Sequence, residues 1–385
     1  IRDSGSFKKT IVLLNTGNPM EVDWVEEYDV DAVLWIGCPG EKGFTGVANI
    51  LIGNANPSGK LVDTYAVSSL SAPAVVNNTF NNQQWANLTE ALQKSSSNAS
   101  EISYYTVQTE GIYIGYKYYE TRYEDQVLGR FNATGSAGSI DGVAWDYAKE
   151  VSYPFGYGLS YVTFTYANMA VDKTADVTGN DVLTFTVDVT NTSNTDAYEV
   201  VQLYAVGPNA EALNRADKQL AAFSKVFVKA GETKTVTLTT DMFELAVWDT
   251  ENSRFTLETG NYRFYLGTDC EKPIEGCEVI ANVIADLTPA LKVVTINPAA
   301  YLLKAGDTAE VEATVSLTDD TLYAAKAEIP ETVKLSFESS NPAVATVDAS
   351  TGAITAVAPG VCTITVTAAQ GDAVATATHP VVVAE

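Results

Sequence analysis

Histidine and cysteine are scarce in this chain of 385 residues. There is one histidine, His379, and there are four cysteines. A single histidine leaves almost nothing for catalysis by a Ser–His or Cys–His pair, whereas carboxylate chemistry stays open. His379 stands beside Pro380 in the last expected strand, and we expect it to be structural or exposed.

Basic residues and long apolar runs are also few. Lysine and arginine number 23 against 48 acidic residues, which gives a formal net charge of −25 at pH 7. Phosphate binding needs clustered lysine and arginine, so the charge argues against nucleic acid or an anionic membrane surface as a partner. No apolar run approaches the about 20 residues that span a bilayer. The chain starts at Ile1 without a leader pattern, so a processed or truncated N-terminus is expected.

The four cysteines are too few for a disulfide scaffold and lack the spacing of a zinc site. Cys270 and Cys277 flank Pro273 and Gly276, so a bridge that closes one loop stays open as an alternative to two free thiols. Cys38 and Cys362 lie in apolar contexts and are predicted to be buried thiols. We predict no metal and no cofactor.

What the chain does contain changes in character near residue 286. Residues 286–385 hold twelve acidic and four basic side chains, no tryptophan, and three of the 38 aromatic residues. Two regions that differ so much are not expected to share one core. We therefore divide the chain into residues 1–150, 151–285 and 286–385.

The first 65 residues alternate between strand and helix patterns. Residues 10–14 and 32–36 are continuous apolar runs of strand length. Helical spacing occupies residues 20–28 and recurs around Val47, with Gly53 placed as a stop signal. Continuous apolar strands between helices predict a parallel sheet covered on both faces. Two such units are too small for a domain, so this is predicted to be the end of a larger α/β sandwich.

Residues 66–150 are irregular in pattern, with a tyrosine-dense stretch around residues 113–119. Short alternating strands then follow in two sets and predict two all-β sandwiches. The first set is 164, 182–189, 200–206, 226–228, 233–239, 255–257 and 262–266; the second is 311–315, 333–337, 343–347, 353–357 and 361–367. The predicted fold is therefore multidomain: a partial α/β sandwich with a parallel sheet, followed by two immunoglobulin-like sandwiches.

Several motifs resemble glycoside hydrolase family 3 in that family's order. TIVLLNTGNPME, AVLWIGCPGEKGFTGVANILIG and NANPSGKLVDTYA, then EGIYIGYKYYETRYED and VSYPFGYGLSYVTF, are similar to its C-terminal α/β sandwich domain. EVVQLYAVGP, KQLAAFSKVFVKAGE and GNYRFYLG are similar to its fibronectin type III-like domain. Together these motifs extend over about 260 residues.

The C-terminal part resembles a bacterial immunoglobulin-like domain of group 2. The resemblance is carried by FESSNPAVATVD, TGAITAV and PGVCTITV, which begin at Phe337, Thr351 and Pro359. Because such modules commonly sit on secreted or surface proteins, the resemblance implies an extracellular or cell-surface location in a bacterium.

The family resemblance implies hydrolysis of β-glucosides or β-xylosides with retention of configuration. Such chemistry needs two carboxyl groups about 5 Å apart, one as nucleophile and one as acid/base. In the family both stand upstream of the segment that matches residues 10–14. No catalytic residue is therefore carried over to this chain, which is expected to be inactive without a barrel-containing N-terminal portion, present as a separate chain or as further sequence. The implied substrate is a β-linked oligosaccharide or glycoside.

Three residues are candidates for the substrate cleft. Glu41 lies in the loop region after the second predicted strand, and Asn18 lies in the loop after the first. The carboxyl edge of a parallel sheet is where α/β proteins place ligands. For Glu41 the alternative is a place in the first turn of a helix, where the helix dipole favours an acid.

The third candidate is Glu110, beside the tyrosines of residues 104–123. Those tyrosines form either a sugar-binding platform or, as we favour, packing of the core and of domain contacts. Glu110 and Arg122 either pair with each other or touch a saccharide. An alternative function for the whole chain is a non-catalytic surface adhesion or carbohydrate-binding protein.

Overall fold

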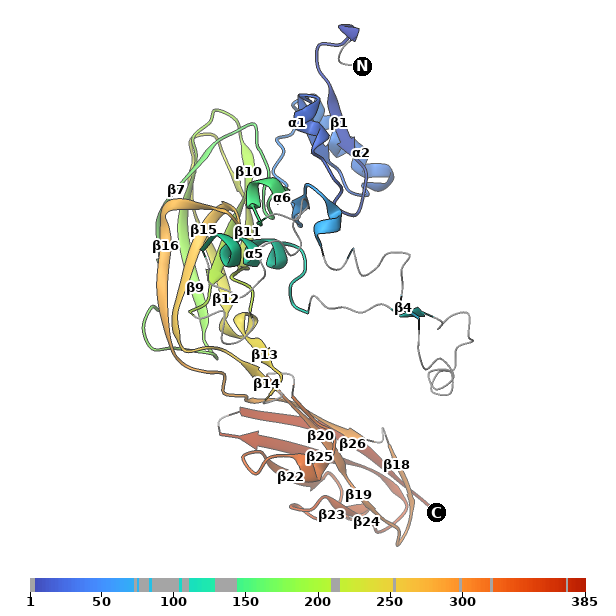
Figure 1. Cartoon of the computed structure of the whole chain (residues 1–385). Coiled ribbons are helices and arrows are strands. Elements are labelled where there is room, and N and C mark those ends of the chain that lie inside the picture. Colours follow the sequence, from blue (N-terminus) through green and yellow to red (C-terminus); the bar gives the residue numbers. More distant parts are fainter. Residues whose placement is uncertain are drawn as a thin grey trace. The chain divides into compact units, whose positions relative to one another are not determined.

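The computed structural model describes residues 4–72, 75, 83–84, 104–105, 111–128, 144–208, 215–251, 254–297, 300–318, 321–371 and 373–385. It divides into two compact units. The first comprises Ile1–Val247 and Leu257–Asp286, and the second comprises Trp248–Thr256 and Leu287–Glu385. Figure 1 shows the elements of both units in chain order.

The N-terminal segment contains two parallel strands, as the apolar runs predict. β1 (Ile11–Leu14) pairs with β2 (Ala32–Trp35), with Ile11 opposite Ala32. The connecting helix α1 (Trp24–Glu27) is shorter than predicted, because Asp23 already accepts a hydrogen bond from the backbone N–H of Trp24 and caps it.

A second helix, α2 (Gly40–Leu51), follows β2. Its chain continues through Ile52 into Gly53, whose φ of +78° is the left-handed conformation that a helix stop favours. One side of the strand pair packs into a small core made of Leu14, Val22 and Tyr65, with Val12, Trp24, Val25, Val33, Trp35, Leu61 and Tyr153 around it.

The segment predicted as irregular contains a substantial helix. α5 (Tyr116–Leu128) is 13 residues long and begins directly after Gly115, whose φ is +56°. Its tyrosines contribute to a core of Ala66, Tyr119, Trp145 and Val151. The irregular interpretation was wrong here because tyrosines recurring at helical spacing bury one side of the segment.

Short elements complete this segment. β3 (Tyr65–Ala66) pairs antiparallel with β6 (Val151–Tyr153), and β4 (Gln83–Gln84) pairs with β5 (Tyr104–Tyr105). The remaining short helices are η2 (Ser69–Ser71) and α6 (Tyr147–Glu150).

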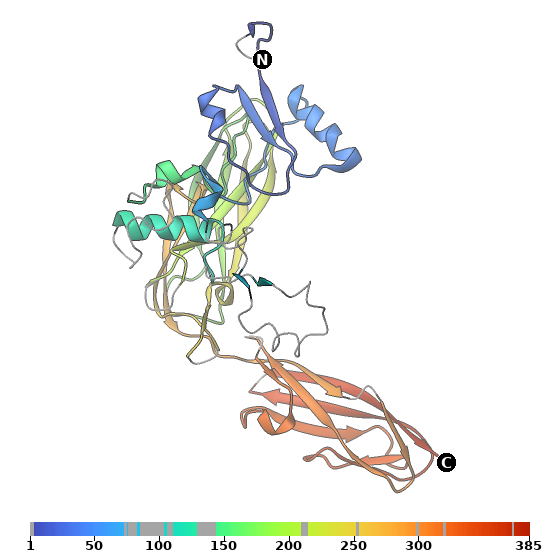
Figure 2. The ribbon, with the colours of Figure 1, turned by 45° about the vertical axis from the view of Figure 1, so that its right-hand side comes forward.

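The rest of the first unit is a sandwich of two sheets, antiparallel apart from one short parallel edge strand, and its long strands are visible in Figures 1 and 2. One sheet has the order β12-β9-β7, from Thr233–Asp241, Val182–Asn191 and Phe164–Val171. The other has the order β11-β10-β15-β16-β8, from Lys218–Val228, Ala197–Val206, Gly260–Asp269, Lys272–Ala285 and Val177–Thr178. Phe185 and Phe264 meet in its core with ring centroids 4.9 Å apart.

The strand β16 corrects the view that Pro273 and Gly276 mark a loop. Both lie on β16, where the register against β15 is irregular. Cys270 and Cys277 are buried free thiols, so the described structure contains no bridge between them. Cys362 is buried as predicted, but Cys38 is exposed, because it lies in the turn between β2 and α2 rather than within the strand.

Three short elements lie near the point where the chain passes between the units. They are η3 (Met242–Leu245), β13 (Val247–Asp249) and β14 (Arg254–Thr256), and β13 pairs with β14. Trp248 and Phe255 contact each other edge to face, with ring centroids 5.1 Å apart.

The second unit is an all-β module whose strands form three small sheets (Figure 2). They have the orders β17-β20-β21, β18-β26-β25-β22 and β19-β24-β23. The bounds are β17 Leu291–Asn297, β18 Tyr301–Lys304, β19 Thr308–Glu310, β20 Glu312–Leu317, β21 Leu322–Tyr323, η4 Lys326–Glu328, β22 Lys334–Ser339, β23 Ala345–Val347, β24 Ala353–Ala356, β25 Gly360–Gln370 and β26 Ala373–Ala384. Its core includes Val311, Ile354, Ile364 and Val381, each fully shielded from solvent.

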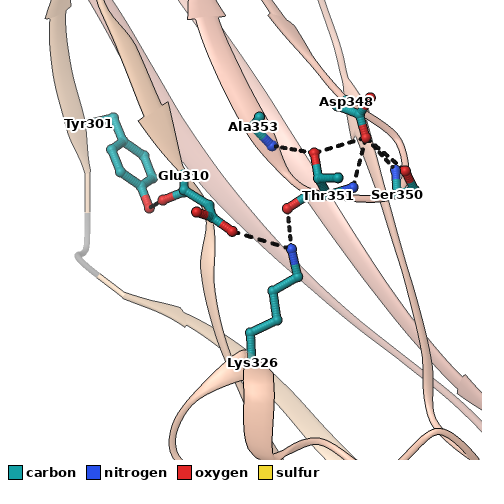
Figure 3. Close-up of polar contacts among 7 residues, drawn as sticks. All are labelled: Tyr301, Glu310, Lys326, Asp348, Ser350, Thr351 and Ala353. Carbon is teal, nitrogen blue, oxygen red and sulfur yellow. Dashed lines mark hydrogen bonds and ion pairs between the residues drawn. The ribbon is translucent and has the colours of Figure 1, made fainter.

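A polar turn closes the hairpin between β23 and β24. Figure 3 shows one carboxylate oxygen of Asp348 facing Ser350 and Thr351, from which it accepts two backbone and two hydroxyl hydrogen bonds of 2.7–3.0 Å. These bonds, led by the Thr351 N–H, hold the pKa of Asp348 well below its usual value. Lys326 adds a contact to the Thr351 carbonyl and an ion pair of 3.5 Å with Glu310.

Candidate functional site

The loops after β1 and β2 come together because parallel strands end at the same edge of a sheet. The indole N–H of Trp35 donates to the carbonyl of Thr16 over 2.8 Å and ties the end of β2 to the loop after β1. Within that loop the Thr16 hydroxyl accepts from the backbone N–H of Asn18 and donates to its carbonyl. The two loops therefore form one local surface.

This surface carries two of the three predicted cleft residues. Asn18 is exposed in the first loop. Glu41 is exposed in the first turn of α2, which is the position that the helix-dipole alternative describes. Gly37 and Gly40, with φ of +56° and +62°, let the second loop turn sharply from β2 into that helix. The assignment of Asn18 and Glu41 to a substrate cleft stays a prediction.

Glu110 lies outside the described residues. Several tyrosines near it are described, and they pack against protein. Tyr116 stacks on Phe155 with ring centroids 4.2 Å apart, and Tyr119 is buried beside Trp145. Burial raises the pKa of both Tyr116 and Tyr119 to about 12. These rings serve as packing, in agreement with the interpretation that we favoured.

A buried charged cluster, which the sequence did not reveal, joins α5 to the large sheet. Glu120 on α5 is fully buried, and one of its carboxyl oxygens accepts a 2.6 Å hydrogen bond from the Tyr147 hydroxyl. Its other oxygen lies 3.5 Å from the Lys218 ammonium. Lys218 also contacts Glu271, in the turn between β15 and β16, at 2.5 Å. The one signal in the sequence is that Glu120 follows Tyr116 by four residues, which places both on the same side of a helix.

A second buried carboxyl group, Glu199 on β10, has a similar but simpler environment. It accepts a 2.9 Å hydrogen bond from the Tyr166 hydroxyl and lies 3.9 Å from the Lys60 ammonium. Burial raises the pKa of Glu199, and the nearby Lys60 charge opposes that shift. This contact links the chain after α2 to the fibronectin-like sheet, the five-stranded sheet β11-β10-β15-β16-β8.

Neither buried cluster has the access that hydrolysis requires. The two carboxyl groups of a glycosidase must reach the sugar and later a water molecule. Glu120, in contrast, is shielded completely from solvent and has Lys218 beside it. We therefore interpret both clusters as connections between elements. Within the described ranges, no group of three His, Cys, Asp or Glu side chains is placed to hold a metal ion. No described helix is long and apolar enough to cross a membrane.

Comparison with known families finds three matches in sequence order. Residues 4–161 match the family model "Glycosyl hydrolase family 3 C-terminal domain". Residues 199–270 match the fibronectin type III-like domain, and residues 290–379 match the group 2 bacterial Ig-like domain. The order is the one that the sequence motifs predict.

Curated relatives match about two thirds of the chain. Thermostable beta-glucosidase B of Acetivibrio thermocellus is 31% identical over 257 residues, covering 67% of this chain and 27% of the relative. Exo-alpha-(1->6)-L-arabinopyranosidase of Bifidobacterium breve is 30% identical over 262 residues, covering 68% and 28%. The chain thus spans little more than a quarter of the length of these relatives.

Solved structures give the same result. Beta-glucosidase 3B from Thermotoga neapolitana in complex with glucose aligns with a TM-score of 0.54 and 27% identity. The alignment covers 74% of this chain and 32% of that structure. The similarity therefore lies in one part of a larger architecture.

Proposed function

Because this chain carries a glycosyl hydrolase family 3 C-terminal domain followed by fibronectin type III-like and bacterial Ig-like domains, we propose that it is the C-terminal part of a retaining β-glycosidase. In this proposal the enzyme acts from the chain end on β-linked glucosides or xylosides. The catalytic aspartate and glutamate belong to an N-terminal portion, and this chain by itself is inactive.

The partly exposed apolar side of the β1–β2 sheet is the observation that carries the proposal. Ile11 and Leu13 on β1 are 48% and 38% exposed. On α2, Phe44 and Leu51 are exposed to a similar extent. Parallel sheets are normally covered on both faces, so a two-stranded parallel sheet with exposed apolar residues requires another partner. In this proposal the N-terminal portion covers these residues, and the greater length of the relatives leaves room for such a portion.

The role of this chain follows from that division. It would complete the sandwich sheet and place Asn18 and Glu41 at one side of the sugar site. The fibronectin-like sheet would support the α/β segment that carries these two residues. This role is supported by the contacts of Glu199 with Lys60 and of Glu120 with Lys218. A hydrolase is favoured over a purely adhesive protein because the matched curated relatives carry enzyme names.

The relatives' names limit the substrate to a class rather than one sugar. One is named for β-glucosidase activity and another for exo-acting cleavage of α-(1→6)-L-arabinopyranosides. We propose an extracellular or cell-surface location as well, on the strength of the Ig-like domain.

The test uses the full-length protein with its N-terminal portion and a panel of aryl glycosides. The panel contains β-D-glucoside, β-D-xyloside and α-L-arabinopyranoside, and the anomer released first is identified by NMR. The proposal expects hydrolysis of a β-D-glucoside or β-D-xyloside with the first product in the configuration of the substrate. An inverted first product, or no turnover of any member, would contradict it.

A further inference from the structure

The cluster of Glu120, Lys218, Glu271 and Tyr147, here called the clamp, brings three charged side chains together in the first unit, two of them buried and Glu271 19% exposed. Each member comes from a different element: α5, the first residue of β11, the turn between β15 and β16, and the first residue of α6. The cluster therefore joins α5 to the fibronectin-like sheet. Figure 1 shows α5 beside that sheet.

Two further hydrogen bonds of α5, one to β11 and one to the residue before it, are between neutral groups. The backbone N–H of Leu220 donates to the Tyr116 hydroxyl over 3.0 Å, and the N–H of Asp217 donates to the Thr121 hydroxyl over 3.2 Å. These bonds do not change with pH in the neutral range. The clamp, by contrast, contains carboxyl groups whose charge changes with pH.

The clamp contains two carboxyl groups for one ammonium group. If Glu120 and Glu271 were both ionised, the site would hold a net charge of −1, with Glu120 shielded from water and only Glu271 partly exposed. An uncompensated buried charge is strongly unfavourable. One proton held between the two carboxyl groups makes the site neutral, leaving Lys218 to pair with the ionised Glu271 at 2.5 Å.

We propose that the clamp is a proton-dependent lock: a proton kept on Glu120 holds α5 against the fibronectin-like sheet, and loss of that proton as the pH rises loosens α5. The inference concerns the internal coupling of the first unit and does not rest on the proposed glycosidase activity. It makes the fibronectin-like sheet a pH-responsive support for the segment around α5.

The titration of the two carboxyl groups agrees with this geometry. Burial, followed by the neighbouring Glu271, raises the pKa of Glu120 well above its ordinary value. For Glu271 burial acts in the same direction, but the hydrogen bond with Glu120 and the Lys218 charge outweigh it and lower the pKa. A carboxyl group whose pKa is higher in the folded state stabilises the fold fully below its unfolded pKa, and this contribution is lost as the pH rises through the folded pKa.

Other titratable groups face the clamp and stay in one state through the neutral range. Burial is the largest cause that raises the pKa values of Tyr116, Tyr147, Tyr265 and Cys270, so these groups remain neutral. Lys218 stays charged, because Glu120 and Glu271 raise its pKa in spite of burial. The flanking groups on the turn are Asp269 and Lys272, whose charged atoms lie 4.0 Å apart.

Hydrogen exchange of the whole chain, followed by mass spectrometry, tests the lock. Protection of backbone amides in residues 116–122 is measured from pH 5 to pH 9 and corrected for the intrinsic exchange rate. The scan starts above the ordinary glutamate pKa of about 4.3, so protection in the wild type should fall from pH 5 upward, by up to about tenfold per pH unit, and level off once Glu120 is ionised. Glu120→Gln keeps an acceptor for Tyr147 but cannot ionise, so its profile should be flat.

Two further variants complete the design. Glu271→Gln removes the second carboxylate, so an ionised Glu120 is neutralised by Lys218 and the fall in protection should vanish. Glu199→Gln is the matched control, because that carboxyl group is also buried beside a tyrosine and a lysine but lies outside the clamp. It should leave the profile of residues 116–122 unchanged.

The proposal is overturned if wild type and Glu120→Gln give the same profile, or if Glu199→Gln removes the fall equally well. If the clamp variants fail to fold, an infrared measurement on the wild type tests the proposal instead. The wild-type spectrum at pH 7 should show the carbonyl band of a protonated, buried carboxyl group. Absence of that band overturns the lock.

Discussion

At the scale of single residues, the core of the Ig-like module contains one polar side chain of special interest. His379 is 3% exposed, packs edge to face against Tyr301 with ring centroids 4.8 Å apart, and has its Nε2 atom without a hydrogen-bond partner among the described residues. Protonation would place a charge on this buried ring, which burial disfavours. The pKa of His379 is accordingly lowered by burial.

Because His379 is the only histidine, a proton NMR titration of its ring signals is unambiguous. We expect a midpoint below the ordinary value of about 6.5. Since the folded pKa is lowered, the stabilising contribution is complete above the unfolded pKa and is lost as the pH falls through the folded pKa. A midpoint at or above 6.5 would show that the ring is not buried as described.

Thermal unfolding of the whole chain gives an independent check on the same residue. The transition of the Ig-like module should move to lower temperature as the pH falls from 7 to 5. His379→Gln, which cannot be protonated in this range, should lessen that movement. If the unfolding temperature depends on pH equally in wild type and variant, groups other than His379 cause the dependence.

The sequence anticipates residue environments unevenly. Asn18 and Glu41 were placed on neighbouring loops because each directly follows a recognisable strand. The clamp was missed because Glu120, Lys218 and Glu271 are far apart in sequence, and each has an ordinary local context. Cys38 was predicted to be buried because an apolar neighbourhood was taken as strand, although Gly37 already turns the chain outward.

At the scale of elements, the turn around Gly156 fixes how the segment before the sandwich meets β10. The N–H of Gly156 donates to the Leu61 carbonyl over 2.8 Å, and its own carbonyl accepts from the Gln202 amide over 3.1 Å. Its φ is +82°, and an added Cβ would lie 2.4 Å from both the Gln202 amide oxygen and the Tyr204 hydroxyl. Glycine is therefore required twice, by conformation and by space.

Gly156→Ala should destabilise the first unit by about 2–4 kcal/mol, from the left-handed conformation together with overpacking. Gly231→Ala is the control: its φ is +71°, but an added Cβ meets nothing within 4 Å. The free energy of unfolding of that variant should fall by only about 1 kcal/mol. Denaturant unfolding measures both, and equal losses would mean that the close approach at Gly156 is absent.

Element prediction succeeds where burial alternates cleanly and fails where it does not. The strands β9 and β12 alternate between buried and partly exposed positions and were found from the pattern. In β16, Pro273, Gly276 and an irregular register obscure the alternation, so the stretch between Cys270 and Cys277 was taken for a loop. α5 was missed because tyrosine, lysine and glutamate at helical spacing give only a weak apolar stripe.

At the scale of the whole molecule, the first unit contains both a well-covered sandwich and an uncovered sheet. Val187, Val201 and Phe264 are fully buried in the sandwich, whereas Ile11 and Leu13 on β1 are substantially exposed. Apolar area that stays exposed on this strand contributes no hydrophobic stabilisation, whereas a partner that covers it would add some. The uncovered side is where we expect the N-terminal portion to dock.

Leu13→Asp should weaken assembly with a separately expressed N-terminal portion by at least about tenfold, because a charge would be buried at the contact. Calorimetric titration of the two polypeptides measures the affinity. Leu302→Asp is the control, since Leu302 on β18 is 78% exposed and lies in the Ig-like module. Equal affinities for wild type and Leu13→Asp would place the contact elsewhere.

The central claim is that this chain completes a β-glycosidase whose catalytic carboxyl groups lie on another portion. The most direct measurement compares hydrolysis of an aryl β-D-glucoside or β-D-xyloside by residues 1–385 alone, by the N-terminal portion alone, and by the two together. We predict turnover only for the combination, or for the full-length protein. Turnover by residues 1–385 alone, or failure of both the combination and the full-length protein, would contradict the account.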